Sequence, residues 1–229
     1  MVGVILCAAL GFTAGPSSAQ NAAQQVTQKN TANSSILPVA TNVPVTPNTA
    51  EIQKAEAFFA TLKTAQARFV QTNSDGHQIR GTFYLSRPGK LRFEYDAPNK
   101  DFVVADGVFI YFYDSQTGQQ TNAPISQTLA DFILRKNLKL SNDLKVTEIL
   151  KAAGLVQIHI VQRDSPDAGS LVLGFAEGDD GAYHLKKWRI LDSMGNITEV
   201  ELFNVQTGVT FKNANLFAYQ DPQRKGYNK

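Results

Sequence analysis

From about residue 67 to residue 206, apolar and polar residues alternate with a period of two in short runs. Successive side chains of a β-strand point to opposite faces, so each run is typical of a strand with one buried face. Pro88-Gly89, Asp106-Gly107 and Asp180-Gly181 are turn-forming pairs that separate neighbouring runs. Short strands joined by tight turns predict a mainly β (α+β) domain built on one curved or barrel-like antiparallel sheet.

The expected strands share this alternation. They cover residues 67–73, 78–86, 91–96, 102–105, 108–114, 145–151, 155–163, 171–176, 184–192, 197–206 and 210–211. One of them, 108–113, is apolar or aromatic on both faces, whereas a half-exposed strand normally alternates with polar residues. Its second face therefore needs either a covering element or a ligand.

Two helices are expected beside the sheet. The first begins near a capping box of Asn48 and Glu51. Its apolar residues recur at helical spacing: Ile52, Ala55, Phe59 and Leu62. The second covers residues 126–136, interrupts the strands near their middle and carries Leu129, Phe132 and Ile133 on one stripe.

The first 48 residues differ in composition from the rest of the chain. An apolar run at residues 2–12 is too short to span a membrane and is followed by small residues that end at Ala19. We interpret residues 1–19 as a secretory signal peptide, although no Lys or Arg precedes the run; a buried segment of the domain is the alternative. Cleavage would remove Cys7, the only cysteine, which fits an exported, periplasmic protein without disulfides.

The remaining boundaries follow from polarity. Residues 20–48 are rich in Gln, Asn, Thr, Ser and Pro, and predict a disordered tether. Residues 49–220 form the expected domain, and residues 221–229 a charged C-terminal tail.

The chain offers little for catalysis or for nucleic-acid binding. Its net charge is only +2, and no block of Lys and Arg indicates a nucleic-acid partner. His77, His159 and His184 lack metal-ligand spacing, and no nucleophile motif or phosphate-binding loop occurs. We expect no enzymatic activity, no catalytic residue, no metal and no cofactor.

An ordered set of short motifs carries a family resemblance. Phe69-Val70-Gln71 is followed by the stretch 81–95 around the Arg87-Pro88 turn, and then by the stretch 103–114, which ends in Tyr113-Asp114. This set resembles the periplasmic outer-membrane lipoprotein carrier family (LolA). The resemblance implies an incomplete antiparallel β-barrel with helices over its concave mouth. It also implies a monomeric carrier that takes lipoprotein acyl chains from an inner-membrane ABC transporter to an outer-membrane acceptor.

Strand parity indicates which residues would line such a cavity. Gly81, Phe83, Leu85 and Arg87 share one face, as do Leu91, Phe93 and Tyr95 after the turn. The expected cavity residues are Phe69, Phe83, Leu85, Leu91, Phe93 and Tyr111. Leu91 departs from family members that have an aromatic residue there.

Arg87 admits two interpretations. The residues alone favour an arginine that flanks a turn in solvent. The resemblance implies instead that Arg87 reaches backbone carbonyls of a lid helix, the one expected at 126–136, and holds the lid closed. At the level of function, the rivals are a half-barrel with a different lipid cargo or a sensor role, and a rigid envelope-interaction module with a filled core.

Overall fold

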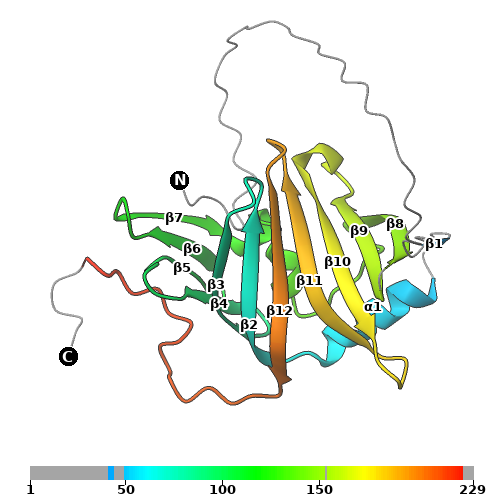
Figure 1. Cartoon of the computed structure of the whole chain (residues 1–229), viewed down its shortest axis with the longest axis horizontal. Helices are drawn as coiled ribbons and strands as arrows, with labels where there is room; N and C mark the ends of the chain where they lie inside the picture. The colour runs from blue at the N-terminus through cyan, green and yellow to red at the C-terminus, as the bar shows by residue number, and fades with distance from the viewer. Residues whose placement is uncertain (1–40, 44–48, 153, 224–229) are drawn as a thin grey trace, which may run out of the picture.

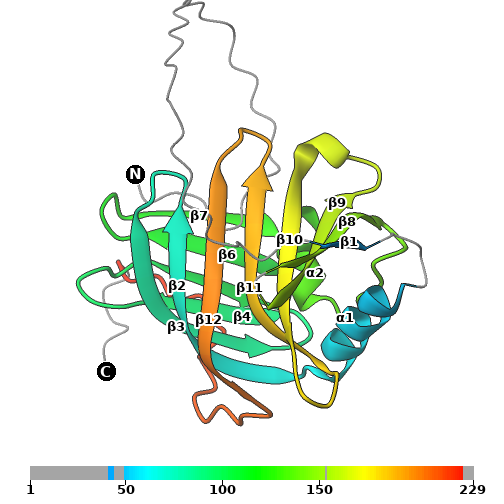
Figure 2. The same cartoon turned by 45° about the vertical axis from the view of Figure 1, so that its right-hand side comes forward.

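The structure is a computed structural model that describes residues 41–43, 49–152 and 154–223. Its twelve strands form one sheet in which neighbouring strands are antiparallel (Figures 1 and 2). The strands are β1 (Thr41–Val43), β2 (Thr64–Asn73), β3 (Gln78–Ser86), β4 (Lys90–Tyr95), β5 (Phe102–Asp106), β6 (Phe109–Asp114), β7 (Gln119–Pro124), β8 (Leu144–Ala152), β9 (Leu155–Gln162), β10 (Gly169–Glu177), β11 (Tyr183–Asp192) and β12 (Ile197–Thr207).

The sheet is strongly curved but does not close. Its order is β1-β8-β9-β10-β11-β12-β2-β3-β4-β5-β6-β7, so β1 and β7 are its two edges. Two runs of consecutive hairpins, β2–β7 and β8–β12, meet where β12 pairs with β2. The predicted fold class, a single antiparallel sheet that forms an incomplete β-barrel, is confirmed.

The concave face carries the main hydrophobic core. Along β3 and β4 the pairs Phe83–Phe93 and Leu85–Leu91 lie directly opposite each other. Since alternate residues point to one face, the whole apolar set of this hairpin is turned inward. The same alternation in the other strands lines the rest of the face, so the core follows the curvature of the sheet.

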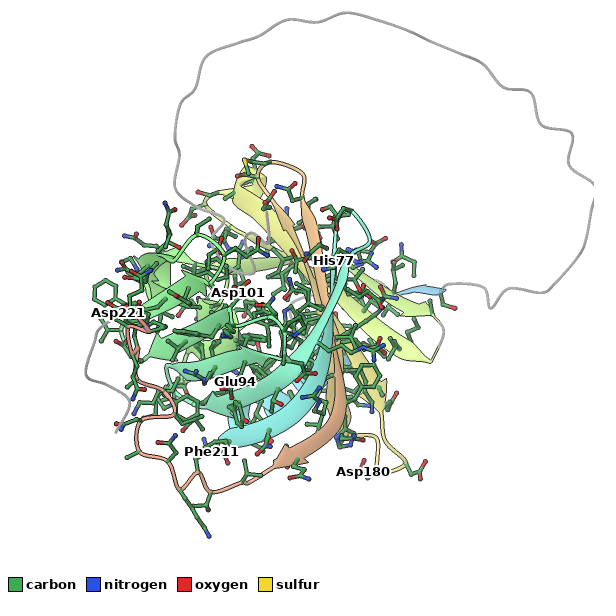
Figure 3. All side chains as sticks on the ribbon, turned by 60° about the vertical axis from the view of Figure 1, so that its left-hand side comes forward. His77, Glu94, Asp101, Asp180, Phe211 and Asp221 are labelled. Atoms are coloured by element: carbon green, nitrogen blue, oxygen red, sulfur yellow. The ribbon has the colours of Figure 1, made fainter. Side chains whose placement is uncertain are left out.

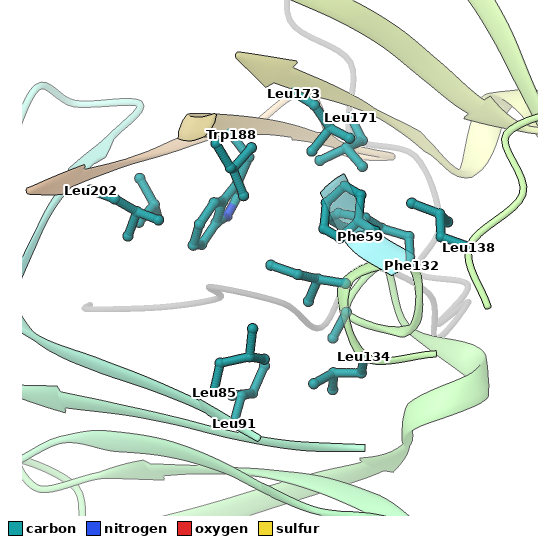
Figure 4. Close-up of a cluster of buried hydrophobic side chains, with 14 of the residues drawn as sticks. Phe59, Leu85, Leu91, Phe132, Leu134, Leu138, Leu171, Leu173, Trp188 and Leu202 are labelled. Carbon is teal, nitrogen blue, oxygen red and sulfur yellow. The ribbon is translucent and has the colours of Figure 1, made fainter. Parts of the chain in front are cut away.

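Two helices and a 3-10 turn lie on the concave side. They are α1 (Ala50–Thr61), η1 (Ile125–Gln127) and α2 (Asp131–Leu134). Figure 4 shows their apolar side chains between two walls of the sheet: Phe59, Phe132, Leu134 and Leu138 from the helices and the segment after α2, facing Leu85 and Leu91 on one side and Leu171, Leu173, Trp188 and Leu202 on the other. None of the helices in the described ranges has the length and hydropathy that a bilayer crossing requires.

Several predicted boundaries were wrong. The expected helix at 126–136 divides into η1 and the single turn of α2, because the backbone of Thr128 is extended and its hydroxyl donates to the carbonyl of Ile125. At α1 the cap position is Thr49, whose carbonyl accepts from the amides of Ile52 and Gln53. The predicted cap, Asn48, lies outside the described residues.

The two edge strands were not expected. The first four residues of β7 are polar and exposed, so they lack the alternation of a strand with one buried face. β1 lies within the segment predicted to be a disordered tether, and it pairs with β8 from Thr41–Lys151 to Val43–Ile149. By contrast, residues 210–211 are not a strand.

The C-terminal segment after β12 crosses the convex face. The ring of Phe211 meets Tyr84 at 6.0 Å, and the ring of Tyr219 stacks on Tyr111 at 4.8 Å between centroids. Figure 3 labels Phe211 and Asp221 toward the two ends of this segment. The second aromatic face of the strand at 108–114 is therefore covered by the chain itself, and with Tyr219 it forms a small outer cluster around Phe102.

Candidate functional site

Five of the six predicted cavity residues come together on the concave face. Phe69, Phe83, Leu85, Leu91 and Phe93 belong to one cluster, and each exposes no more than 2% of its surface. The ring of Phe93 lies 5.1 Å from that of Phe69 and 4.8 Å from that of Phe83. In this structure the helices cover these side chains, so the face is an apolar lining with its cover in place.

Tyr111 was assigned to the wrong face. It points to the convex side, into the outer cluster, and its hydroxyl donates to Asp106 Oδ2 at 3.1 Å. Parity could not decide the matter in a strand that is apolar on both faces. The residue that faces inward there is Ile110, which belongs to the main core.

Sequence reasoning did not single out Trp188, whose ring lies 5.8 Å from Phe83 and 6.1 Å from Phe93. The pairing of β10 with β11 slips by one residue, from Gly174–Lys187 to Phe175–Leu185. A bulge of this kind shifts the inward parity of a strand, so Leu185 and Trp188 both face inward although they are three residues apart. A strict period of two therefore misses the opposite wall of the lining.

Arg87 joins the two covering elements. Its Nη1 donates to the carbonyls of Phe59 and, at 3.1 Å, of Leu62 at the end of α1. Its Nη2 donates to the carbonyl of Arg135, directly after α2. The side chain is thus a clasp between α1 and α2 rather than a solvated turn residue, and α1 is a partner that the prediction had omitted.

The surroundings of this clasp are apolar. Arg87 is only 9% exposed, and its guanidinium lies 5.4 Å from the centroid of the Phe59 ring. Burial lowers the pKa of the guanidinium, but arginine remains protonated at physiological pH. Nε has no hydrogen-bond partner among the described residues, so the buried cation depends on the three carbonyls.

The two covering elements are held to the sheet differently. α1 is tied through its N-terminal half by ion pairs of Glu51 with Lys151, at 2.7 Å, and of Lys54 with Glu177. The hydrogen bond from Lys151 holds the pKa of Glu51 below its usual range. α2 is tied at its end by the amide of Gly89, which donates to the carbonyl of Leu134 at 2.9 Å, and by Arg87. The sheet thus holds α1 by ion pairs of its side chains and α2 by hydrogen bonds to carbonyls at its C-terminal end.

Within residues 41–43, 49–152 and 154–223, no three His, Cys, Asp or Glu side chains are grouped to hold a metal ion. Tyr95, whose hydroxyl donates to Gln71 at 3.0 Å, has its pKa raised by burial and then by the charge of Asp101. The apolar lining under α1 and α2 is suited to shelter apolar matter.

The chain is similar to known carriers over most of its length. The family model described as outer membrane lipoprotein carrier protein LolA matches residues 60–220. An outer-membrane lipoprotein carrier protein of Methylococcus capsulatus is 27% identical over 177 residues, covering 74% of this chain and 83% of the relative. One of Methylobacillus flagellatus is 26% identical, with 77% and 88% covered. A crystallised LolA superfamily protein of Nitrosomonas europaea is 9% identical, with 73% and 96% covered and a TM-score of 0.42.

Proposed function

The chain belongs to the outer membrane lipoprotein carrier family, and on that premise we propose that it carries lipoprotein acyl chains between its concave sheet face and the helices α1 and α2. The observation that supports this proposal most directly is the pairing of an apolar lining with a cover held by one buried arginine. The clasp gives both covering elements one set of hydrogen bonds that loading could break.

Binding in this scheme is an exchange of apolar contacts. In the empty protein, side chains such as Phe59 and Leu134 cover the lining. When an acyl chain enters, its methylenes take over these contacts, each worth about 0.8 kcal/mol when buried. The free energy gained on loading is the difference between the contact free energies of the acyl chain and of the helix side chains, less the free energy needed to break the hydrogen bonds of Arg87. Cargo can then be released without an external energy source.

The family membership also supports the wider pathway. We propose that the protein is a periplasmic monomer that receives lipoproteins from an inner-membrane ABC transporter and yields them to an outer-membrane acceptor, as a binding protein rather than an enzyme. A half-barrel that carries a different lipid, and an interaction module with a permanently filled core, are the competing functions.

Native mass spectrometry of protein purified from the periplasm separates these functions. The proposal predicts a fraction of the protein with the added mass of a lipoprotein, increasing when a lipoprotein substrate is co-expressed. The added mass of a different lipid would identify another cargo. A protein that carries no lipid under either condition would favour the filled core.

Export predicts a defined N-terminus. We expect N-terminal sequencing of the protein from the periplasm to begin at Gln20, because the small residues that end at Ala19 suit signal peptidase. A mature protein that retains Cys7, in particular with an attached lipid, would contradict export as a free carrier and would indicate a membrane-anchored acceptor.

A further inference from the structure

A groove lies on the outer side of the seam between α1 and the sheet. It has a volume of about 520 Å³ and runs between α1 and the adjoining ends of β11 and β12. Ala57, Phe58 and Leu62 form one side, and Tyr183 and Thr207 are on the other. It is therefore separate from the covered face on which Phe93 lies, although it borders the same core.

The floor of this groove is the wall of the core. Leu62 and Tyr183 belong to the main core cluster and are 7% and 3% exposed. Phe58 packs edge-on against Phe175 with ring centroids 5.8 Å apart, and Tyr183 stacks on Phe175 at 5.3 Å. A single layer of aromatic rings thus lies between the groove and the interior. Rotation of the Phe58 ring away from Phe175 would bring the groove into contact with the core.

Several polar groups beside the groove already have partners. The Thr61 hydroxyl donates to the carbonyl of Phe58 at 3.0 Å, and the amide of Gly208 donates to the carbonyl of Thr64 at 3.0 Å. The ammonium of Lys54 pairs with Glu177 and lies 5.4 Å from the centroid of the Tyr183 ring. Burial raises the pKa of Tyr183 to about 12, so its phenol is neutral. Apart from His184 and the hydroxyls of Tyr183 and Thr207, which also border it, the described lining of the groove offers few free donors and acceptors. It therefore favours hydrocarbon over a peptide or sugar, which would need more of them.

We propose that this groove is a hydrocarbon-binding portal, in which one acyl chain of the cargo lies against Phe58 and Tyr183 on its way into or out of the interior. The proposal rests on the proposed function and names the route that the cargo takes. The chain would pass inward where the Phe58 ring turns aside from Phe175. The three ion pairs of α1, which include Glu56 with Lys139 at 2.7 Å, would keep the helix in position meanwhile.

Two alanines of α1 provide a matched test. Ala57 and Ala60 are both exposed, but only Ala57 borders the groove. Ala57→Trp should fill the groove, whereas Ala60→Trp adds the same side chain outside it. A third substitution, Thr207→Trp, lies at an exposed position on the opposite side and should fill the groove without altering α1. The probe for all variants is a palmitic acid with a photoreactive diazirine at its distal end, used with the full-length mature protein.

We expect Ala57→Trp and Thr207→Trp to bind the probe at least tenfold more weakly, about 1.4 kcal/mol, with unchanged melting temperatures. Ala60→Trp should bind like the wild type, and cross-links in the wild type should include Phe58 or Tyr183. Wild-type affinity in both groove variants, with cross-links confined to concave residues such as Phe93, would overturn the portal and leave the carrier function intact. Binding of the probe by neither the wild type nor any variant would overturn both.

Discussion

Arg87→Leu is expected to load normally but to release its cargo poorly, and so to accumulate in the loaded form. The wild-type side chain makes three charge-assisted bonds to carbonyls at the end of α1 and of the residue after α2. We expect these bonds to break when the cover opens. Each bond is worth about 1.5–3 kcal/mol. Loss of the equivalent of one bond would shift the ratio of loaded to empty protein by roughly 10- to 150-fold.

The measurement is transfer of a radiolabelled lipoprotein from the purified carrier to acceptor-containing membranes. Arg87→Lys should recover only part of the rate, because an ammonium lacks the planar fork that reaches several carbonyls. Arg80→Leu makes the same change of charge at an exposed position of β3 and should transfer like the wild type. Normal transfer by Arg87→Leu would leave the arginine a purely structural role.

Phe93→Glu is expected to abolish cargo binding and to lower the free energy of unfolding by more than about 3 kcal/mol. Phe93 is 1% exposed and packs its ring against Phe69, Phe83 and Trp188. Truncation of a packed phenylalanine alone costs about 3–5 kcal/mol, and a carboxylate in its place would be buried among the rings of Phe69, Phe83 and Trp188. In the open form the same charge would face the acyl chains.

Stability and binding can be separated at this position by substitutions of graded polarity. Phe93→Leu keeps the site apolar, so it should retain most binding in spite of a lower melting temperature. Val108→Glu places the same charge at a residue that is 64% exposed and should change neither property. Unfolding is followed by circular dichroism and binding by co-purification of lipoprotein. A folded Phe93→Glu that binds lipoprotein with wild-type affinity would remove the concave face from the mechanism.

The strands and the centre of the lining could be predicted because each depends on a local pattern. Phe83, Leu85, Leu91 and Phe93 belong to one hairpin, so the turn at Pro88-Gly89 and the period of two determine their common face. The contacts of Arg87 with the covering helices could be predicted only from the family resemblance. Its acceptors are backbone carbonyls from positions as distant as Phe59 and Arg135. No side-chain pattern identifies a carbonyl.

The errors arose where contacts between distant segments decide the outcome. Tyr111 faces outward because Tyr219, far along the chain, covers it there. Trp188 faces inward because of a slip in pairing between β10 and β11. The extent of the helix at 126–136 was overestimated, since Thr128 bonds to Ile125 and its extended backbone interrupts the helix. None of these contacts leaves a periodic signal.

The pairing of β12 with β2 has a consequence for folding kinetics. It joins Thr198 to Asn73 across about 125 residues, whereas most other neighbouring strands are consecutive in the chain. Closure of so long a loop costs more entropy than closure of a hairpin, and such non-local pairing slows folding. During translation the first meander would emerge with its β2 edge unpaired, exposing apolar side chains that invite aggregation. The two walls meet only when the last strand arrives, so a truncated polypeptide that lacks β12 would have no enclosure in which to hold an acyl chain.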